Sequence, residues 1–217
     1  MACFVPFNNR NLHISLLVFR PTVLFVDDLV DALKQFSLCT ENLGCIHSSI
    51  FRSIHGNMIV WYGAWMKRST DNKQLLNAAL ISMLTNVASM AILIDSSFFE
   101  AYNGESKDGS PAAKFFNGDV ISLSCATILD DNPNEHTLSC ACLSLFKDHF
   151  IKMEGATAGV CMKSQTLPKL VGLFVWKSLQ FCYSDILNSD CRNTILPYFG
   201  GIPLDVKYDI FRVVYVS

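Results

Sequence analysis

Cysteine and histidine are the residues in this sequence whose types and spacing could support chemistry. The chain has nine cysteines and five histidines. A nucleophilic cysteine needs a nearby base and a lowered thiol pKa. His149 and Cys161 flank the glycine-containing segment 155–159 and could face each other across a hairpin, while Cys45 and His47 would share one face of a strand. Either pair could serve a thiol-dependent enzyme, but no local signature of a known one is present, and buried small residues with turn imidazoles explain both pairs more simply.

A metal site would have to use the Cys-x-Cys pair of Cys140 and Cys142, whose side chains would share one face of a strand. Cys125 would lie across a predicted hairpin from them. Zinc sites more often present Cys-x₂₋₄-Cys on a turn, with a second pair of ligands elsewhere. Packing of three small residues in a sheet is the simpler explanation, so we expect no metal and no other cofactor.

Trp61 and Trp65 are the candidates for an aromatic ligand-binding wall. They lie on one face of the run Met58–Met66, which has no polar face. A strand that is apolar on both faces must be covered on both, so it belongs in the middle of a sheet. Each indole N–H then needs a buried hydrogen-bond partner. We therefore interpret the two rings as core anchors before we interpret them as a ligand site.

The elements that would position these residues follow from hydrophobic periodicity and turn residues. Gly56-Asn57 between two β-rich runs predicts a hairpin over 49–67. Residues 1–102 predict the order β-α-β-β-α-β, which is typical of ferredoxin-like folds and of other α/β sandwiches. The elements are a strand at 12–19, a helix at 23–36, the hairpin, a helix at 71–86 and a strand at 90–94.

The remainder of the chain is predicted to be richer in strands. A short helix at 97–102 precedes a flexible loop or linker at 103–118, which is rich in Gly, Ser, Lys and Asp. Strands are predicted at 120–128 and 138–146, paired as a hairpin, and at 160–163. A long buried helix is predicted at 167–188, with Pro168 in its first turn, and a final strand at 206–217.

These elements predict an α+β fold, an α/β sandwich with mixed, largely antiparallel sheets. Its parts would be a β-α-β-β-α-β half at 1–102, the linker at 103–118, and a β-rich half at 119–217 that contains the long helix and the terminal strand. A chain of 217 residues is long enough for one large domain or for two small ones that share a core. We expect one composite domain.

The composition predicts a soluble, intracellular protein. Hydrophobic residues make up 51% and charged residues 17%, below the roughly 25% of an average soluble domain. The net charge is −2 and the basic residues do not cluster, so we expect no nucleic-acid partner. No apolar stretch is long enough for a membrane span, and no secretory signal is recognised. The odd number of cysteines favours reduced thiols, hence a cytoplasmic or nuclear location.

Two stretches, Gly56–Ser69 and Lys207–Val216, are similar to parts of an uncharacterised plant protein family. The resemblance extends over most of the chain. It implies no known activity and assigns no functional residue. It also implies that relatives continue beyond the last strand.

Without a complete catalytic set, the sequence favours a non-enzymatic protein-interaction or regulatory domain. A protein partner or a second copy would add to the edge of the last strand. The first alternative is a small-ligand sensor of the GAF or PAS type, by fold analogy alone, with Trp61 or Trp65 in its pocket. The second is a thiol-dependent enzyme that uses Cys161 and His149. The sequence does not say whether a small molecule is bound.

Overall fold

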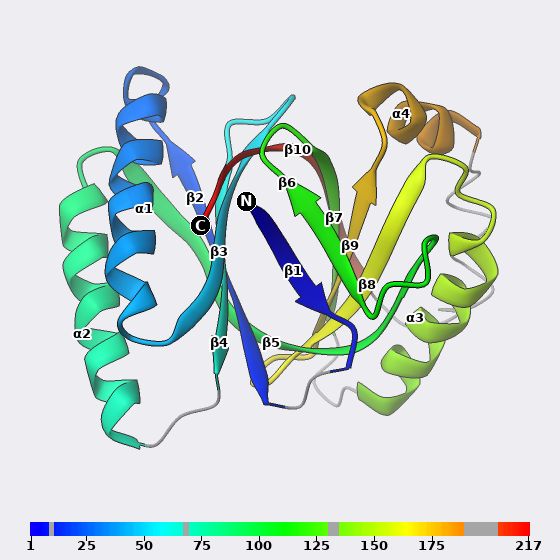
Figure 1. Cartoon of the computed structure of the whole chain (residues 1–217), viewed down its shortest axis with the longest axis horizontal. Helices are drawn as coiled ribbons and strands as arrows, with labels where there is room; N and C mark the ends of the chain where they lie inside the picture. Colours follow the sequence, from blue (N-terminus) through cyan, green and yellow to red (C-terminus); the bar gives the residue numbers. More distant parts are fainter. Residues whose placement is uncertain (9–10, 67–69, 130–134, 189–203) are drawn as a thin grey trace.

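Eight strands form a closed barrel with helices on two sides (Figure 1). The computed structural model describes residues 1–8, 11–66, 70–129, 135–188 and 204–217. The barrel strands are β2 (Leu12–Pro21), β3 (Cys45–Ser53), β4 (Ile59–Met66), β5 (Ala91–Ser106), β7 (Val120–Ile128), β8 (Ala156–Ser164), β9 (Lys169–Trp176) and β10 (Leu204–Val216). The helices are α1 (Val26–Glu41), preceded by the 3-10 turn η1 (Val23–Phe25), α2 (Thr70–Val87), α3 (Glu135–Phe150) and α4 (Leu179–Asn188).

The barrel is built from two halves with the same connectivity. The strands lie in the order β5-β2-β4-β3 in the first half and β10-β7-β9-β8 in the second. In each half one helix follows the first strand and another follows the third. Antiparallel pairing of β5 with β8 and of β3 with β10 closes the barrel. Helices α1 and α2 lie on one side of the barrel and α3 and α4 on the other (Figure 1).

The inside of the barrel is filled, in part by a two-stranded ribbon that was not predicted. β1 (Ala2–Pro6) pairs with β6 (Ala112–Phe116), and buried side chains of both strands join the inward-facing residues of the barrel in one cluster. The ring of Phe115 lies 5.6 Å from that of Phe51 and 6.1 Å from that of Tyr62. The ribbon therefore completes the core of the barrel.

The outer face of the first half is packed by tryptophans. Trp61 and Trp65 on β4 lie 5.9 Å apart between ring centres and belong to the cluster beneath α1 and α2. The indole N–H of Trp61 donates to Ser37 Oγ at 2.9 Å, and that of Trp65 donates to Ser15 Oγ at 2.7 Å. β4 is buried on both faces, as its sequence predicts.

An ion pair joins the two halves on the inner side of the barrel. Lys169 at the start of β9 pairs with Asp95 on β5, and Asp95 also accepts a hydrogen bond of 2.7 Å from Ser97. Only 10% of the Lys169 side chain is exposed. The pair is therefore much less hydrated than the surface pair of Lys34 with Asp31, in which the side chains are 38% and 73% exposed.

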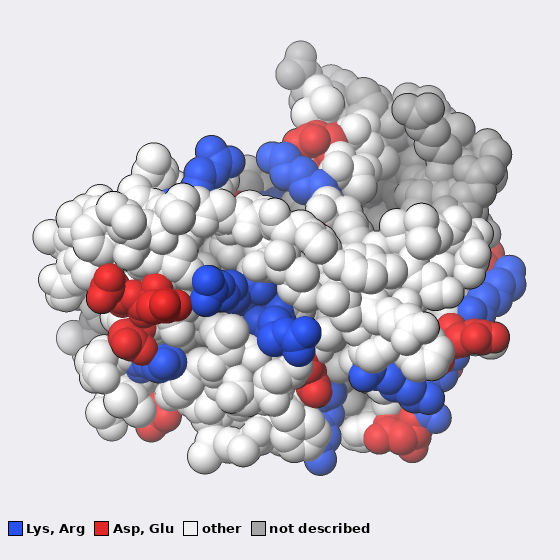
Figure 2. All heavy atoms as spheres, turned by 90° about the horizontal axis from the view of Figure 1, so that it is seen from above, with Lys and Arg blue, Asp and Glu red and all other residues white. Residues whose placement is uncertain are grey.

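The surface carries little charge, as the composition implies. Seen from above, most of one face is uncharged, and acidic side chains gather on the side of α1 next to basic ones (Figure 2). Arg52 on β3 contacts Asp27 at the start of α1 at 3.1 Å in an exposed ion pair. None of the helices in the described ranges is both long and apolar enough to cross a membrane.

The predicted long helix at 167–188 is wrong. Residues 169–176 form β9, and the helix α4 covers only 179–188. The run 170–175 is almost wholly apolar, and periodicity does not separate a buried helix from a buried strand in such a run. Covered by the barrel core on one face and by α3 on the other, it is a strand. A final strand does follow, as β10.

The predicted strand at 138–146 is also wrong, because these residues lie in α3. Ala141, Leu145 and Phe146 recur at helical spacing, and Phe150 continues the same face. The predicted hairpin with 120–128 does not form, since β7 pairs with β9 and β10.

Residues 97–118 are strands rather than a short helix and a flexible loop. β5 continues to residue 106 because it pairs with β2 along its first part and with β8 along its second. β6 then occupies 112–116, which leaves 107–111 for the connection. The α+β class and the largely antiparallel sheet are confirmed, whereas the domain boundaries drawn at 102 and 119 stay a prediction.

Candidate functional site

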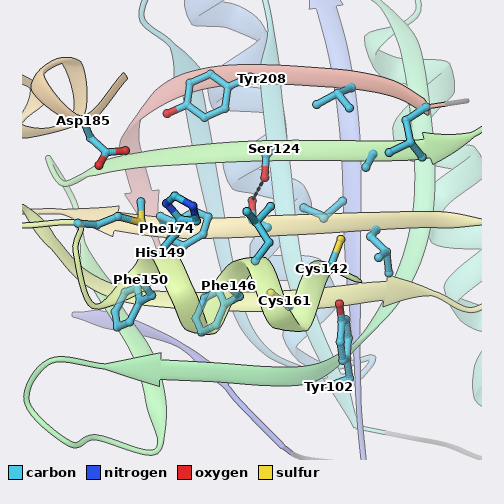
Figure 3. A pocket seen from close by; sticks show the side chains of 18 residues that line it. Tyr102, Ser124, Cys142, Phe146, His149, Phe150, Cys161, Phe174, Asp185 and Tyr208 are labelled. Atoms are coloured by element: carbon cyan, nitrogen blue, oxygen red, sulfur yellow. Dashed lines mark hydrogen bonds between the residues drawn. The ribbon is translucent and has the colours of Figure 1, made fainter. Parts of the chain in front are cut away.

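A cavity of about 220 Å³ lies between the outer face of the second half of the barrel and helices α3 and α4 (Figure 3). Its walls come from five strands, both helices and the residues after α3. They are Tyr102, Ser124, Ala126, Cys142, Leu145, Phe146, His149, Phe150, Met153, Cys161, Leu170, Val171, Gly172, Phe174, Asp185, Leu204, Val206 and Tyr208. Most of these side chains are apolar, so the cavity favours an apolar occupant.

A Ser–Gly pair occurs in each half of the barrel and allows the two halves to be compared position by position. Ser15 on β2 pairs with Gly63 on β4, and Ser124 on β7 pairs with Gly172 on β9. In both pairs the serine hydroxyl lies near the glycine carbonyl oxygen, at 3.4 Å and 3.5 Å. A Cβ on Gly172 would lie 2.7 Å from Ser124 Oγ, so the serine hydroxyl would have to move to accommodate a larger residue. The two Ser–Gly pairs, each on the first and third strands of its half, therefore give an alignment of the two halves.

Next to this pair the second half carries smaller side chains than the first. Two residues before the glycine, Leu170 stands where the first half has Trp61. Two residues after the serine, Ala126 stands where the first half has Leu17. Trp61 and Leu17 pair across β4 and β2 and are buried, and Leu170 and Ala126 pair in the same way across β9 and β7. Side-chain volume is therefore smaller at two adjacent positions of the second half, and both Leu170 and Ala126 line the cavity.

One side of the cavity is a wall of stacked phenyl rings, formed by Phe146, Phe150 and Phe174. Phe146 lies 5.2 Å from Phe150 at an interplanar angle of 6°, and 5.8 Å from Phe174 at 23°. A Cβ on Gly159 would lie 2.8 Å from the rings of both Phe146 and Phe174, so glycine lets the rings lie against the sheet. Nearly parallel rings present a flat apolar surface, which suits a planar ligand.

Apart from Ser124, whose hydroxyl lies near the Gly172 carbonyl oxygen, the polar groups of the wall gather at two places toward opposite ends of Figure 3. The first, here called the tyrosine end, comprises Tyr102, Cys142 and Cys161. Burial raises the pKa of both thiols to about 12. Burial, with a contribution from the neighbouring thiols, also raises the pKa of Tyr102 well above its usual value. All three groups are therefore uncharged near neutral pH.

The second place, here called the acid end, comprises His149, Asp185 and Tyr208. Burial raises the pKa of Asp185, and the nearby His149 imidazole opposes this rise. The Tyr208 hydroxyl lies 3.6 Å from the sulfur of Cys182. An imidazole and a carboxyl group on one wall of an apolar cavity can accept, hold and return a proton.

The structure brings both members of the predicted thiol pair, His149 and Cys161, to the wall of the same cavity. Cys161 is 7% exposed on β8, and His149 lies in the last turn of α3. A thiol with a raised pKa is a poor nucleophile near neutral pH, so burial works against the predicted role of Cys161. A catalytic role for the pair stays a prediction. Burial raises the thiol pKa of Cys45 and lowers the imidazole pKa of His47.

The three cysteines considered for metal binding do not converge. Because α3 is a helix, Cys140 is exposed while Cys142 lines the cavity, and Cys125 lies partly buried on β7. Within the residues that the structure describes, no group of three or more His, Cys, Asp or Glu side chains could hold a metal ion. Trp61 and Trp65 are not in the cavity either, since they pack in the first half.

Sequence reasoning missed Tyr102, Ser124 and Asp185 as members of the site. Tyr102 was placed at the end of a short helix and Asp185 inside a long one. The one signal that could have marked the site is the Ser–Gly pair in each half. It becomes visible only once the strand registers are known.

Residues 97–211 match a family described as "Domain of unknown function (DUF7392)". The match covers more than half of the chain. The chain belongs to the DUF7392 family. All residues that line the cavity lie inside the matched segment, so the cavity is part of the DUF7392 domain. An uncharacterised family agrees with the resemblance noted above, and its plant origin stays a prediction. A search of curated proteins finds no match.

Solved structures share the fold of this DUF7392 protein over nearly its whole length. An anthrone oxidase-like protein matches with a TM-score of 0.78 at 12% identity, covering 99% of this chain and 96% of that one. A candidate monooxygenase from Fusobacterium nucleatum matches with 0.67 at 10%, covering 95% and 94%. A heme-binding protein from Thermus thermophilus matches with 0.58 at 8%, covering 97% and 95%. At these identities the likeness shows the fold alone.

The hypothesis of a non-enzymatic interaction or regulatory domain is wrong. Several structures that share this fold, including the most similar of those compared above, are named for oxidase-like, monooxygenase and heme-binding proteins. The edge on which that hypothesis depended is also missing, because β10 pairs with β3 on one side and with β7 on the other. The fold is a closed eight-stranded barrel, so the predicted analogy with GAF and PAS domains no longer describes it.

Proposed function

We propose that this DUF7392 protein binds a small, neutral, mainly apolar molecule in the cavity of its second half. The observation that carries the proposal is the difference between the halves. The space that Trp61 and Leu17 fill in the first half is left open beside Leu170 and Ala126 in the second. Ligand sites in proteins are typically concave, mostly apolar pockets with a few polar groups. A cavity of about 220 Å³ with polar groups at two places is therefore best explained by a ligand.

The size of the cavity limits the ligand. An engineered apolar cavity of about 150 Å³ accepts benzene. The cavity here, at about 220 Å³, is larger and suits a molecule of one or two fused rings. Drug-sized ligands occupy pockets of roughly 300–1,000 Å³, so a larger molecule would require the walls to move.

Heme, which one protein of this fold is named for binding, does not fit the site as described. A porphyrin is much larger than a two-ring molecule. Its propionates need positive partners, and no Lys or Arg occurs among the described residues that line the cavity. His149 could ligate an iron atom, but the remaining walls do not suit the group.

Enzymatic oxidation of the bound molecule is the second candidate function. The names of the oxidase-like and monooxygenase-like proteins of this fold favour it. The acid end supports it independently, because His149 and Asp185 could remove and hold a proton of the ligand during such a reaction. Incubation of the full chain with small aromatic compounds in air, followed by mass spectrometry for added oxygen, tests this activity.

Binding is tested with a variant that gives the second half the two larger side chains found at the corresponding positions of the first half. Ala126→Leu with Leu170→Trp restores the larger side chains and should fill the cavity. Naphthalene, indole and tetralin are titrated calorimetrically into the full chain. We expect wild-type dissociation constants on the order of 0.1–1 mM for such small ligands and no measurable binding to the double variant.

The matched control is Ala78→Leu, which adds volume on the exposed surface of α2, away from the cavity. It should bind like the wild type. Circular dichroism checks that the double variant is folded, and Leu170→Phe alone is the milder substitute if it is not. Absence of binding to the wild type, or undiminished binding to the folded filled variant, would refute the proposed function.

A further inference from the structure

The hydroxyl of Tyr102 is buried at the wall of the cavity without a strong hydrogen-bond partner. Its oxygen is shielded from solvent, and within the described part of the chain the side chain that interacts with it as a hydrogen-bonding group is the thiol of Cys161, which is a weak partner. Buried polar groups in folded proteins nearly always have a partner. A buried hydroxyl with only a weak partner beside a cavity points to an acceptor that the ligand supplies.

The surroundings of Tyr102 define what that group must be. The hydroxyl keeps its proton near neutral pH, because burial raises its pKa. It therefore offers an O–H donor. Its polar neighbours are the thiols of Cys161 and Cys142, which are weak hydrogen-bonding groups. A ligand oxygen that accepts a hydrogen bond would complete this end of the cavity.

The charge of the ligand is limited by the same walls. The described lining residues include no Lys or Arg, and the one carboxyl group, Asp185, lies at the opposite end of Figure 3 from Tyr102. A carboxylate or phosphate placed beside Tyr102 would be buried without a positive partner, which is costly. The acceptor next to Tyr102 is therefore expected to be neutral.

We propose that Tyr102 selects ligands that carry a neutral carbonyl oxygen on an otherwise apolar one- or two-ring skeleton. The O–H of Tyr102 donates to that oxygen while the wall formed by Phe146, Phe150 and Phe174 contacts the ring face. Tyr102 is thus a specificity-determining residue. This inference deepens the proposed function and rests on it.

The test uses a pair of probes that differ only in the acceptor. 1-Tetralone and tetralin share a two-ring skeleton, and the first carries a carbonyl oxygen. Dissociation constants of both are measured by calorimetry for the wild type and for Tyr102→Phe. We expect the wild type to prefer 1-tetralone by about tenfold, as for one buried hydrogen bond. In Tyr102→Phe this preference should disappear while tetralin binds as before.

Tyr215→Phe is the matched control. Tyr215 lies on β10 in the cluster beneath α1 and α2, away from the cavity. This variant should keep the preference for 1-tetralone. A preference that survives in Tyr102→Phe, or one that is absent from the wild type although tetralin binds, overturns the role of Tyr102 and leaves the proposed function standing. If neither probe binds the wild type, the proposed function fails as well.

Discussion

Trp61 donates its indole N–H to the hydroxyl of Ser37 at 2.9 Å, which ties β4 to α1 in the half whose outer space is filled. Ser37 passes the interaction on by donating to the carbonyl oxygen of Leu33 at 3.1 Å. The ring of Phe36 packs 4.8 Å from that of Trp61. At the equivalent position of the second half, Leu170 offers no donor and less volume. Trp61 thus attaches a helix to the sheet and also fills space that stays open in the second half.

Trp61→Leu should therefore destabilise the protein by about 3 kcal/mol, close to the cost of other large-to-small substitutions in a core. The reason is the lost ring volume together with the lost hydrogen bond to Ser37. Urea denaturation measures the change. Leu75→Ala on the exposed surface of α2 is the control and should change the stability by less than about 0.5 kcal/mol. A loss below about 1 kcal/mol for Trp61→Leu would contradict the packing described here.

Lys169→Met should lower the free energy of unfolding by about 1–3 kcal/mol, because it leaves the partly buried Asp95 carboxylate without its positive partner. Adding Asp95→Asn should recover part of the loss. Lys34→Met, which breaks the exposed pair with Asp31, is the matched control and should cost less than about 0.5 kcal/mol. Equal effects of Lys169→Met and Lys34→Met in urea denaturation would show that the inner pair contributes no more than a surface pair.

The cysteines should differ widely in their rates of alkylation. Cys39 is exposed and should react first, whereas Cys142 and Cys161 should react slowly because burial raises the pKa of each thiol to about 12. Iodoacetamide labelling followed by peptide mass spectrometry measures the order. The experiment uses the Cys191→Ser variant, so that labelling of this cysteine, which lies outside the described residues, does not complicate the comparison. Rapid and selective labelling of Cys161 near pH 7 would instead revive the thiol-enzyme hypothesis.

Asp185 should make the protein less stable as the pH rises. Burial raises the pKa of this carboxyl group, so the folded state binds its proton more tightly than the unfolded state does. The stabilisation from Asp185 is therefore present at acidic pH and is lost as the pH rises through the raised folded-state pKa. Asp185→Asn should be more stable, relative to the wild type, at pH 7 than at pH 4 in urea denaturation. A difference of the opposite sign would mean that a partner favours the ionised carboxylate.

The first half of the fold could be predicted because its local signals agree with one another. The helical spacing in α1 and α2 and the Gly56-Asn57 turn between β3 and β4 each point to the observed structure. The apolar character of β4 on both faces also predicted its central place in the sheet. Each of these signals depends on neighbours in sequence.

The second half could not be predicted in the same way, because its signals depend on packing. The run that forms β9 is apolar on both faces, and its length fits a strand or part of a helix. α3 was interpreted as a strand although its buried residues have helical spacing. β5 crosses from one half to the other, and its pairing with β8 is not visible in its own sequence.

The site was the least predictable part, since a cavity forms where side chains are too small to fill the space between elements. It depends on small residues such as Ala126 and Gly172 being brought together from different strands. His149 and Cys161 were selected for their chemical types, and the structure does place both on the cavity wall. Nothing in the sequence marks Tyr102, because the lack of a strong partner for its hydroxyl is visible only in the folded chain.

The joining of both halves in one chain has a consequence for stoichiometry. In a barrel assembled from two identical chains, each substitution would occur twice, and a cavity opened on one side would be matched on the other. A single polypeptide removes this constraint, so Trp61 can close one side while Leu170 leaves the other open. A titration that saturates the cavity described here should therefore reach one molecule of ligand per chain rather than two.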